Sequence, residues 1–147
     1  MYKRSIWHIL NMGIPRPYAR RIKYDKFIGT RQVMTLDEQT FQDYLTDQNV
    51  ALVMFYNPQD PESQRTKPHF VKAAKTTSKE NRKAYAAVNC VAEPDLCASQ
   101  NAFPDMLPMM KLYARGKFLS NHGKSLDYRE IRELVEETPF FLSKFRE

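Results

Sequence analysis

Apolar residues in this chain fall into short runs divided by polar turns. Five runs have the length and residue types of strands, and two of them frame the Arg115-Gly116 turn as a hairpin. The expected strands are Gln32–Leu36, Ala51–Tyr56, Ala84–Asn89, Met109–Tyr113 and Lys117–Ser120. Between them, apolar residues recur at helical spacing, as in Phe41, Tyr44 and Leu45. The resulting order, β-α-β-α-β-α-β-β-α, predicts an α/β fold.

Polar residues mark where the helices should begin. Thr35 followed by Glu38 matches a capping box, which predicts a helix that opens at that point and ends near residues 47–49. Glu93–Asn101 is expected to form a short helix. Either Ser125 or Asp127 is expected to cap the last helix, whose apolar face includes Ile131, Leu134 and Val135.

The clearest local signal is the stretch Leu52–Phe70. Its apolar strand stops at Asn57-Pro58, a turn signal, and Asp60-Pro61 then supplies a capping residue before a proline at the first helical position. A strand, a tight turn and an exposed helix N-terminus are therefore expected, which is a corner where α/β proteins commonly mount chemistry. No strong nucleophile stands at this corner.

Charge divides the chain into segments. The net charge of the 147 residues is +6, whereas residues 1–34 hold eight Lys and Arg against Asp25 alone, so the remainder is slightly acidic. We therefore expect a basic N-terminal extension over residues 1–30, a domain over residues 31–138 and a short tail over residues 139–147. No apolar run approaches the ~18 residues that a membrane span requires.

The basic extension has two readings, a targeting segment or an arm that lies across the domain or a partner. An Arg-rich, acid-poor composition suits a mitochondrial presequence, although serine is scarce. Ser5–Leu10 is short for the apolar part of a secretory signal and is interrupted by His8. As an arm, it would suit an acidic partner surface.

Three stretches resemble a thioredoxin domain of the protein disulfide isomerase family. LVMFYNPQDPESQRTKPHF matches the family's apolar strand, Tyr-Ala-Pro-Trp, Cys-x-x-Cys and Lys-Pro-x-Phe, while AAVNCVAEPDLC and MLPMMKLYARGKF resemble two later stretches. The likeness covers roughly Val33–Thr138 and is similar above all to the last domain of disulfide isomerase-related proteins with several thioredoxin domains. It implies a thioredoxin fold, with a central mixed sheet flanked by helices.

The family's two reactive cysteines are replaced. Asp60 and Ser63 stand at those positions, Pro61 and Glu62 lie between them, and Gln59 stands at the motif's tryptophan. Thiol–disulfide exchange needs an attacking thiolate and a second sulfur that resolves the mixed disulfide. The family's redox activity therefore does not carry over through this corner, and we expect no catalytic residue there.

The resemblance also implies two further features. Pro108 aligns with the family's cis-proline, which would give a peptide groove lined by Pro58, Gln59, Asp60, Leu107 and Pro108; alternatively, this proline only stabilises the fold. Cys90 and Cys97 are implied to approach each other. They would form a structural disulfide in oxidising surroundings or two free thiols in a reducing compartment.

Other chemistries find little support in the sequence. His8, His69 and His122 have no metal-ligand spacing, and the four glycines form no phosphate loop, so we expect neither metal nor cofactor. Aromatic residues in the basic extension would suit nucleic acid. Because the domain itself supplies no basic face by count, a nucleic-acid partner is disfavoured.

The predicted function is a redox-inactive module that binds polypeptide or plays a structural role, with protein folding as its expected context. One alternative is residual disulfide isomerase or oxidoreductase activity through Cys90 and Cys97. Another is an assembly subunit anchored by its basic arm. The resemblance points to the endoplasmic reticulum, whereas the absence of a clear signal peptide and of a Lys-Asp-Glu-Leu ending leaves a mitochondrial or cytosolic location open.

Overall fold

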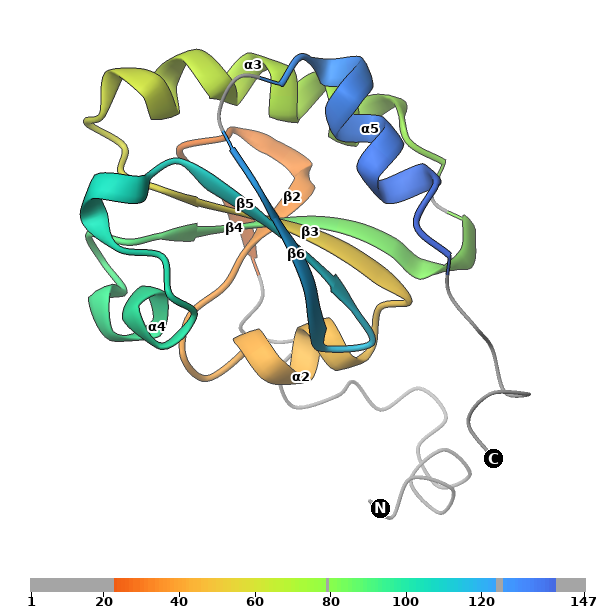
Figure 1. Cartoon of the computed structure of the whole chain (residues 1–147), viewed down its shortest axis with the longest axis horizontal. Coiled ribbons are helices and arrows are strands. Elements are labelled where there is room, and N and C mark those ends of the chain that lie inside the picture. The colour runs from red at the N-terminus through yellow and green to blue at the C-terminus, as the bar shows by residue number, and fades with distance from the viewer. Residues whose placement is uncertain (1–22, 79, 124–125, 140–147) are drawn as a thin grey trace.

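The computed structural model describes residues 23–78, 80–123 and 126–139. Within these ranges, six strands form one twisted sheet with helices on both faces (Figure 1). The strands are β1 (Lys23–Asp25), β2 (Thr30–Thr35), β3 (Val50–Tyr56), β4 (Lys83–Asn89), β5 (Met109–Ala114) and β6 (Lys117–His122). The helices are α2 (Phe41–Thr46), α3 (Pro61–Thr76), α4 (Pro94–Ser99) and α5 (Tyr128–Glu136), with 3-10 turns η2 (Glu80–Arg82) and η3 (Pro104–Met106).

The sheet is mixed, with the order β1-β2-β4-β3-β5-β6. Strands β2, β4 and β3 run parallel, while β1, β5 and β6 are antiparallel to their neighbours. The central strand β3 is buried along its whole length, which its continuous apolar sequence requires. The expected mixed sheet flanked by helices is thus confirmed.

Two hydrophobic cores lie on the two faces of the sheet. Alternate residues of β3 point to opposite faces, so Leu52 and Met54 pack on one side, and Val53 and Phe55 pack on the other. The first core includes Phe70 of α3 and Ile131 of α5. The second is covered by α2 and α4, so each sheet face is closed by a pair of helices.

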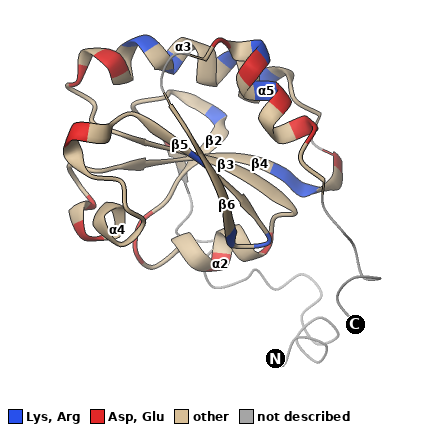
Figure 2. Ribbon diagram, in the orientation of Figure 1, with Lys and Arg blue, Asp and Glu red and all other residues tan. Residues whose placement is uncertain are grey.

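Charged residues lie on the helices and at the strand ends, while most of the sheet interior is uncharged (Figure 2). No helix within the described ranges is long and apolar enough to cross a bilayer. The basic segment before residue 23 and the tail after residue 139 lie outside the described residues.

The predicted capping box at Thr35 is wrong. Thr35 is the last residue of β2, and pairing with both Lys23 and Ala87 holds it in the strand. The Asp37 carboxylate accepts the backbone N–H groups of Gln39 (2.9 Å) and Thr40 (3.0 Å) instead. The following helix consequently starts at Phe41, because Asp37 organises a turn that separates it from the strand.

Strand β1 is absent from the sequence prediction and lies inside the segment assigned to the basic extension. It pairs antiparallel with β2 and closes that edge of the sheet. Three residues with two charges carry no strand periodicity, so only the pairing with β2 defines it. At the other end of the chain, Asp127 caps α5, and its carboxylate and that of Glu130 form a reciprocal capping box.

Candidate functional site

The corner after β3 has the predicted strand–turn–helix form. The Asp60 carboxylate accepts the backbone N–H of Ser63 at 2.9 Å and caps α3, and Pro61 follows at the first helical position. Asn57 shapes the turn, since its side-chain oxygen accepts the N–H of Gln59 at 2.9 Å. Pro58 is half-buried and Gln59 is exposed, so the tip of the turn faces solvent.

Ser63 lies inside this corner and is 0% exposed. Its hydroxyl donates to the Asp60 carboxylate at 3.2 Å and accepts the backbone N–H of Asn57 at 3.3 Å. Both hydrogen-bonding roles of the hydroxyl are therefore used by the corner itself. Asp60 and Ser63 hold the shape of the turn, and neither presents a nucleophile.

A cis peptide bond joins Leu107 to Pro108 immediately before β5. The antiparallel register places Met109 beside Phe55, so the start of β5 meets the end of β3 and the corner that follows it. Leu107 and Pro108 are themselves buried. Two apolar side chains close to Leu107 in the chain are exposed: Phe103 (43% exposed), which precedes the 3-10 turn η3, and Met106 (37% exposed), the last residue of that turn.

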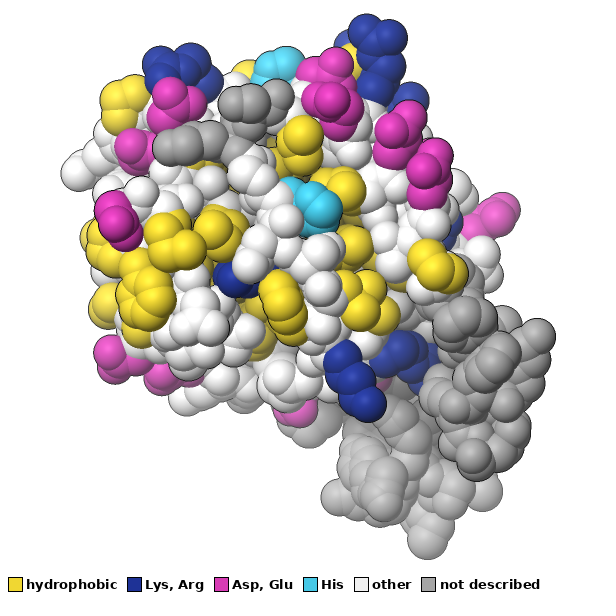
Figure 3. Space-filling view, viewed as in Figure 1, with side chains coloured by type: hydrophobic (Ala, Val, Ile, Leu, Met, Phe, Trp, Pro, Cys, Tyr) yellow, Lys and Arg dark blue, Asp and Glu magenta, His cyan; other side chains and the backbone are white. Residues whose placement is uncertain are grey.

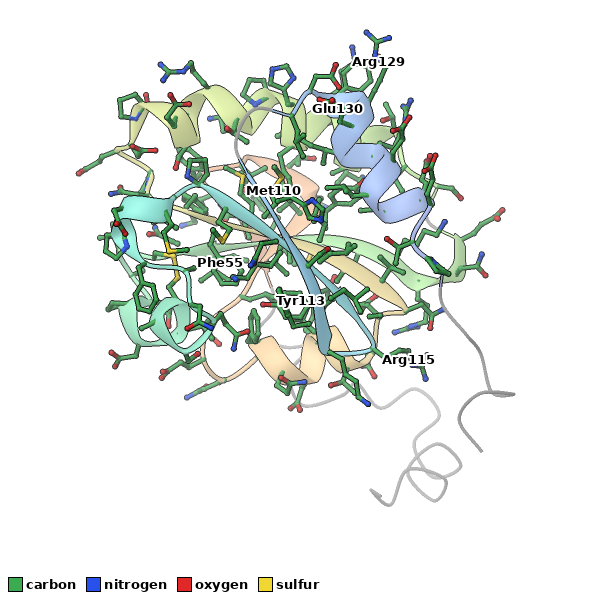
Figure 4. The ribbon with its side chains drawn as sticks, viewed as in Figure 1. Phe55, Met110, Tyr113, Arg115, Arg129 and Glu130 are labelled. Carbon is green, nitrogen blue, oxygen red and sulfur yellow. A yellow bond between two sulfur atoms is a disulfide. The ribbon has the colours of Figure 1, made fainter. Side chains whose placement is uncertain are left out.

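Cys90 and Cys97 form a disulfide, with the two sulfur atoms 2.07 Å apart, beside α4 (Figure 4). Cys90 directly follows β4, and its N–H donates to the Tyr56 carbonyl at 2.8 Å, which ties it to the end of β3. Cys97 is 2% exposed and belongs to the core beneath α4. The bridge therefore joins the end of the sheet to this short helix.

A family model described as Thioredoxin matches residues 32–137. The chain belongs to the thioredoxin family. Among curated proteins, protein disulfide-isomerase A5 of Bos taurus is 35% identical over 92 residues, which are 61% of this chain and 17% of that protein. Protein disulfide-isomerase A4 of Bos taurus is 27% identical over 106 residues, 71% of this chain and 16% of that protein. The chain thus spans about a sixth of the length of these relatives.

Solved structures show the same fold. The first thioredoxin domain of mouse protein disulfide-isomerase A4 matches with a TM-score of 0.68 at 20% identity, covering 90% of this chain and 91% of that domain. Zinc-bound human ERp44 matches with a TM-score of 0.64 at 22% identity, covering 72% and 30% of the two chains. The chain is a thioredoxin domain with relatives in the protein disulfide isomerase family.

This thioredoxin domain contains a buried Asp–Tyr pair that no pattern in the sequence predicted. Asp25 in β1 is 1% exposed, and its carboxylate oxygens accept the Tyr56 hydroxyl at 2.9 and 3.1 Å. The N–H of Ile28 donates to the same carboxylate at 3.1 Å. Burial, the larger cause, and the negative charge of Asp25 together raise the pKa of Tyr56 far above its usual range. Tyr56 therefore stays a hydrogen-bond donor at neutral pH.

Phe27 packs against this pair, and Lys67 in turn contacts Phe27. The Phe27 ring stacks on Tyr56 with centroids 4.5 Å apart, and the Lys67 ammonium lies 4.8 Å from the Phe27 centroid. Lys67 also donates to the Phe27 carbonyl at 3.1 Å, which connects α3 to the loop after β1. One signal in the sequence marks the pair: Asp25 is the single acidic residue among the first 34.

A cavity of about 350 Å³ opens beside the pair, and we name it the carboxyl-end cavity because it lies where the parallel strands β2, β3 and β4 end. Glu93 lines this cavity, and burial together with the neighbouring Asp37 charge raises the pKa of its carboxyl group. The lining comprises Tyr24, Lys26, Phe27, Thr35, Leu36, Asp37, Tyr56, Asn89, Ala92 and Glu93.

Neither of the two histidines in the described ranges takes part in the corner. His69 is exposed on α3, and His122 in β6 bonds to the Ser120 hydroxyl at 2.8 Å. Burial lowers the pKa of His122. His8 lies outside the described residues. Within the described ranges, no group of three His, Cys, Asp or Glu side chains is placed to hold a metal ion.

The disulfide should contribute moderately to stability. Cys90→Ala/Cys97→Ala is expected to lower the free energy of unfolding by ~2–3 kcal/mol, because the bridge constrains the unfolded chain. The loss should be moderate, since the bridge closes a short loop and a longer loop would be constrained more. Urea unfolding of the variant and the wild type gives this difference. An equal loss in reduced wild type supports the bridge as its cause, whereas no loss in either contradicts a structural role.

Proposed function

We propose that this thioredoxin domain is a redox-inactive polypeptide-binding module with a role in protein folding. The proposal rests on the hydrogen bonds that Asp60 and Ser63 make within the corner. They stand where the family has reactive cysteines, and both are engaged in capping α3 and closing the turn. The corner keeps its geometry without a thiol, which supports binding in place of dithiol exchange.

The polypeptide would lie in an extended form across the corner and the start of β5. Pro58, Gln59 and Asp60 supply one wall, while Leu107 and Pro108 supply backbone, since their side chains are buried. Figure 3 shows hydrophobic side chains gathered on the face over α4 and the start of β5. Exposed Phe103 and Met106 belong to this region and suit apolar side chains of an unfolded chain.

The competing function is disulfide exchange through Cys90 and Cys97, which the bond between them favours. Exchange requires an accessible sulfur, and a helix N-terminus favours exchange by lowering the pKa of a thiol and so raising the fraction present as thiolate. Cys97 is buried and lies in the fourth position of the six-residue helix α4, away from its N-terminus. These features favour a structural bridge.

Relatives in the protein disulfide isomerase family support the endoplasmic reticulum as the location, and a disulfide is compatible with that oxidising compartment. The basic segment is proposed to contact an acidic protein surface. If it instead anchors the domain in an assembly, deleting residues 1–22, which precede β1, should release the partner and leave the fold intact.

Binding can be tested with reduced, carboxymethylated α-lactalbumin as a permanently unfolded probe. Phe103→Ser/Met106→Ser is expected to weaken its binding by roughly tenfold, because about 1.4 kcal/mol of apolar contact is lost. Phe118→Ser is the matched control, since Phe118 is 51% exposed on β6, away from the corner. Fluorescence anisotropy of the labelled probe gives the affinities.

Insulin reduction separates the two functions. The wild-type chain should show no turnover above the uncatalysed rate. Turnover that Cys97→Ser abolishes would establish exchange through the disulfide and overturn the binding-only proposal. Equal binding losses in the Phe103→Ser/Met106→Ser variant and the Phe118→Ser control would overturn the proposed groove.

A further inference from the structure

A second cavity, of about 340 Å³, lies at the opposite end of the parallel strands from the corner. We name it the amino-end cavity, because it opens where β2 and β4 begin. Three cationic residues line it, namely Arg31, Arg82 and Lys83, together with the polar residues Gln32, Tyr44 and Gln48. No Asp or Glu belongs to the lining that the structure describes. The start of β4 is marked as basic in Figure 2.

Two of these cations, Arg31 and Lys83, stand near the amino ends of adjacent parallel strands. Val33 of β2 lies beside Tyr85 of β4, and Arg31 and Lys83 each stand two residues earlier on these parallel strands. Both residues belong to the lining of this one cavity. Like charges that line one cavity repel each other. An anion between them would remove this repulsion.

The third cation is held in place by backbone contacts. Arg82 has a left-handed backbone (φ 53°), its Nε donates to the Asp47 carbonyl at 2.6 Å, and its own carbonyl accepts the N–H of Asn49 at 3.0 Å. Its charge also acts on Tyr44, because it opposes the burial that raises the pKa of that phenol to about 12. Arg82 and Tyr44 both line the amino-end cavity.

Arg31 and Lys83 are less constrained. Neither makes an ion pair or a side-chain hydrogen bond with another part of the chain that the structure describes. Their charged groups are therefore available to a ligand, whereas the contacts of Arg82 with Asp47 and Asn49 fix the position of its positive charge. Of the three, Arg31 and Lys83 can be replaced without breaking a described contact.

We propose that the amino-end cavity binds a small molecule through a phosphate or sulfate group. Arginine pairs with the oxygens of such groups in a bidentate manner, and lysine adds a point charge. The volume falls within the ~300–1,000 Å³ of small-molecule sites. The carboxyl-end cavity is similar in size yet is lined by Asp37 and Glu93. The basic lining of the amino-end cavity therefore does not follow simply from the net charge of +6.

Pyrophosphate is the probe for this site. Isothermal titration of the full chain is expected to show one saturable site, and Arg31→Gln/Lys83→Gln is expected to weaken binding by roughly tenfold or more, since two charge-assisted contacts are lost. Lys75→Gln/Lys117→Gln is the matched control, because it also removes two charges, from the exposed residues Lys75 and Lys117 outside the cavity. It should bind as the wild type does.

Three further measurements make the outcome specific. Arg31→Lys/Lys83→Arg should retain most of the affinity, and amide shifts in NMR spectra should concentrate at Tyr44 and Gln48. Thermal unfolding should show that every variant is folded at the assay temperature. The proposal is overturned if pyrophosphate does not saturate one site, or if both charge-removing variants lose affinity equally. It is also overturned if a glutamate-rich peptide binds as tightly as pyrophosphate through Arg31 and Lys83, since the surface would then recognise an acidic polypeptide.

Discussion

Replacing Asp25 by alanine is expected to lower the free energy of unfolding by about 3 kcal/mol, because two buried donors lose their acceptor. These donors are the Tyr56 hydroxyl and the backbone N–H of Ile28. The variant should therefore unfold at lower urea concentration. Because Asp25 belongs to β1, the loss should be accompanied by faster amide hydrogen exchange along the β1–β2 edge.

Asp25→Asn is the matched control. Its amide oxygen can still accept both hydrogen bonds, so we expect a loss of about 1 kcal/mol. A double-mutant cycle that combines Asp25→Ala with Tyr56→Phe should give a coupling energy of ~1–3 kcal/mol, since the residues are in direct contact. Additive losses in this cycle would contradict the interaction.

Installing cysteines at the corner is expected to create thiol–disulfide activity. In the variant Asp60→Cys/Ser63→Cys, insulin reduction should rise from the uncatalysed rate to a measurable turnover. Asp60 is the N-cap of α3, and a thiol at a helix N-terminus has a lowered pKa. Because the Ser63 hydroxyl lies 3.2 Å from the Asp60 carboxylate, a thiol at each position could form the resolving pair.

The single variant Asp60→Cys separates attack from turnover. It has a thiol at the N-cap and no partner at Ser63, so it should form mixed disulfides without sustaining reduction. Thiol titration and mass spectrometry distinguish these states. If the double variant forms its new disulfide and still fails to reduce insulin, the corner does not retain the geometry of an active thioredoxin site.

Local sequence accounts for most of the elements. Continuous apolar runs predicted β3, β4 and β5 within a residue or so at each end, because buried strands need little besides such a run. The prediction at Thr35 was wrong, since a capping box is a local pattern and two neighbouring strands hold Thr35 in the sheet. Strand β1 has no local pattern at all.

The candidate site likewise has one part that the local sequence predicted and other parts that it did not. The cap formed by Asp60 before Pro61 is encoded within four residues, so the sequence alone predicted it. The Asp25–Tyr56 contact joins positions 31 residues apart on strands that are not adjacent in the sheet, and no local pattern links them. A count of charges likewise gave the domain no basic face, although Arg31, Arg82 and Lys83 line one cavity at the amino ends of β2 and β4.

The resemblance of three stretches to the protein disulfide isomerase family implied the thioredoxin fold. The residues themselves predicted the α/β class, the strand–turn–helix corner and the lack of a thiol within it. These features rest on apolar runs, turn residues and caps, which act over a few neighbouring positions. Only the tertiary structure brought Asp25 to Tyr56 and three cations to the lining of the amino-end cavity. Burial and strand register fix those meetings, and both depend on the whole sheet.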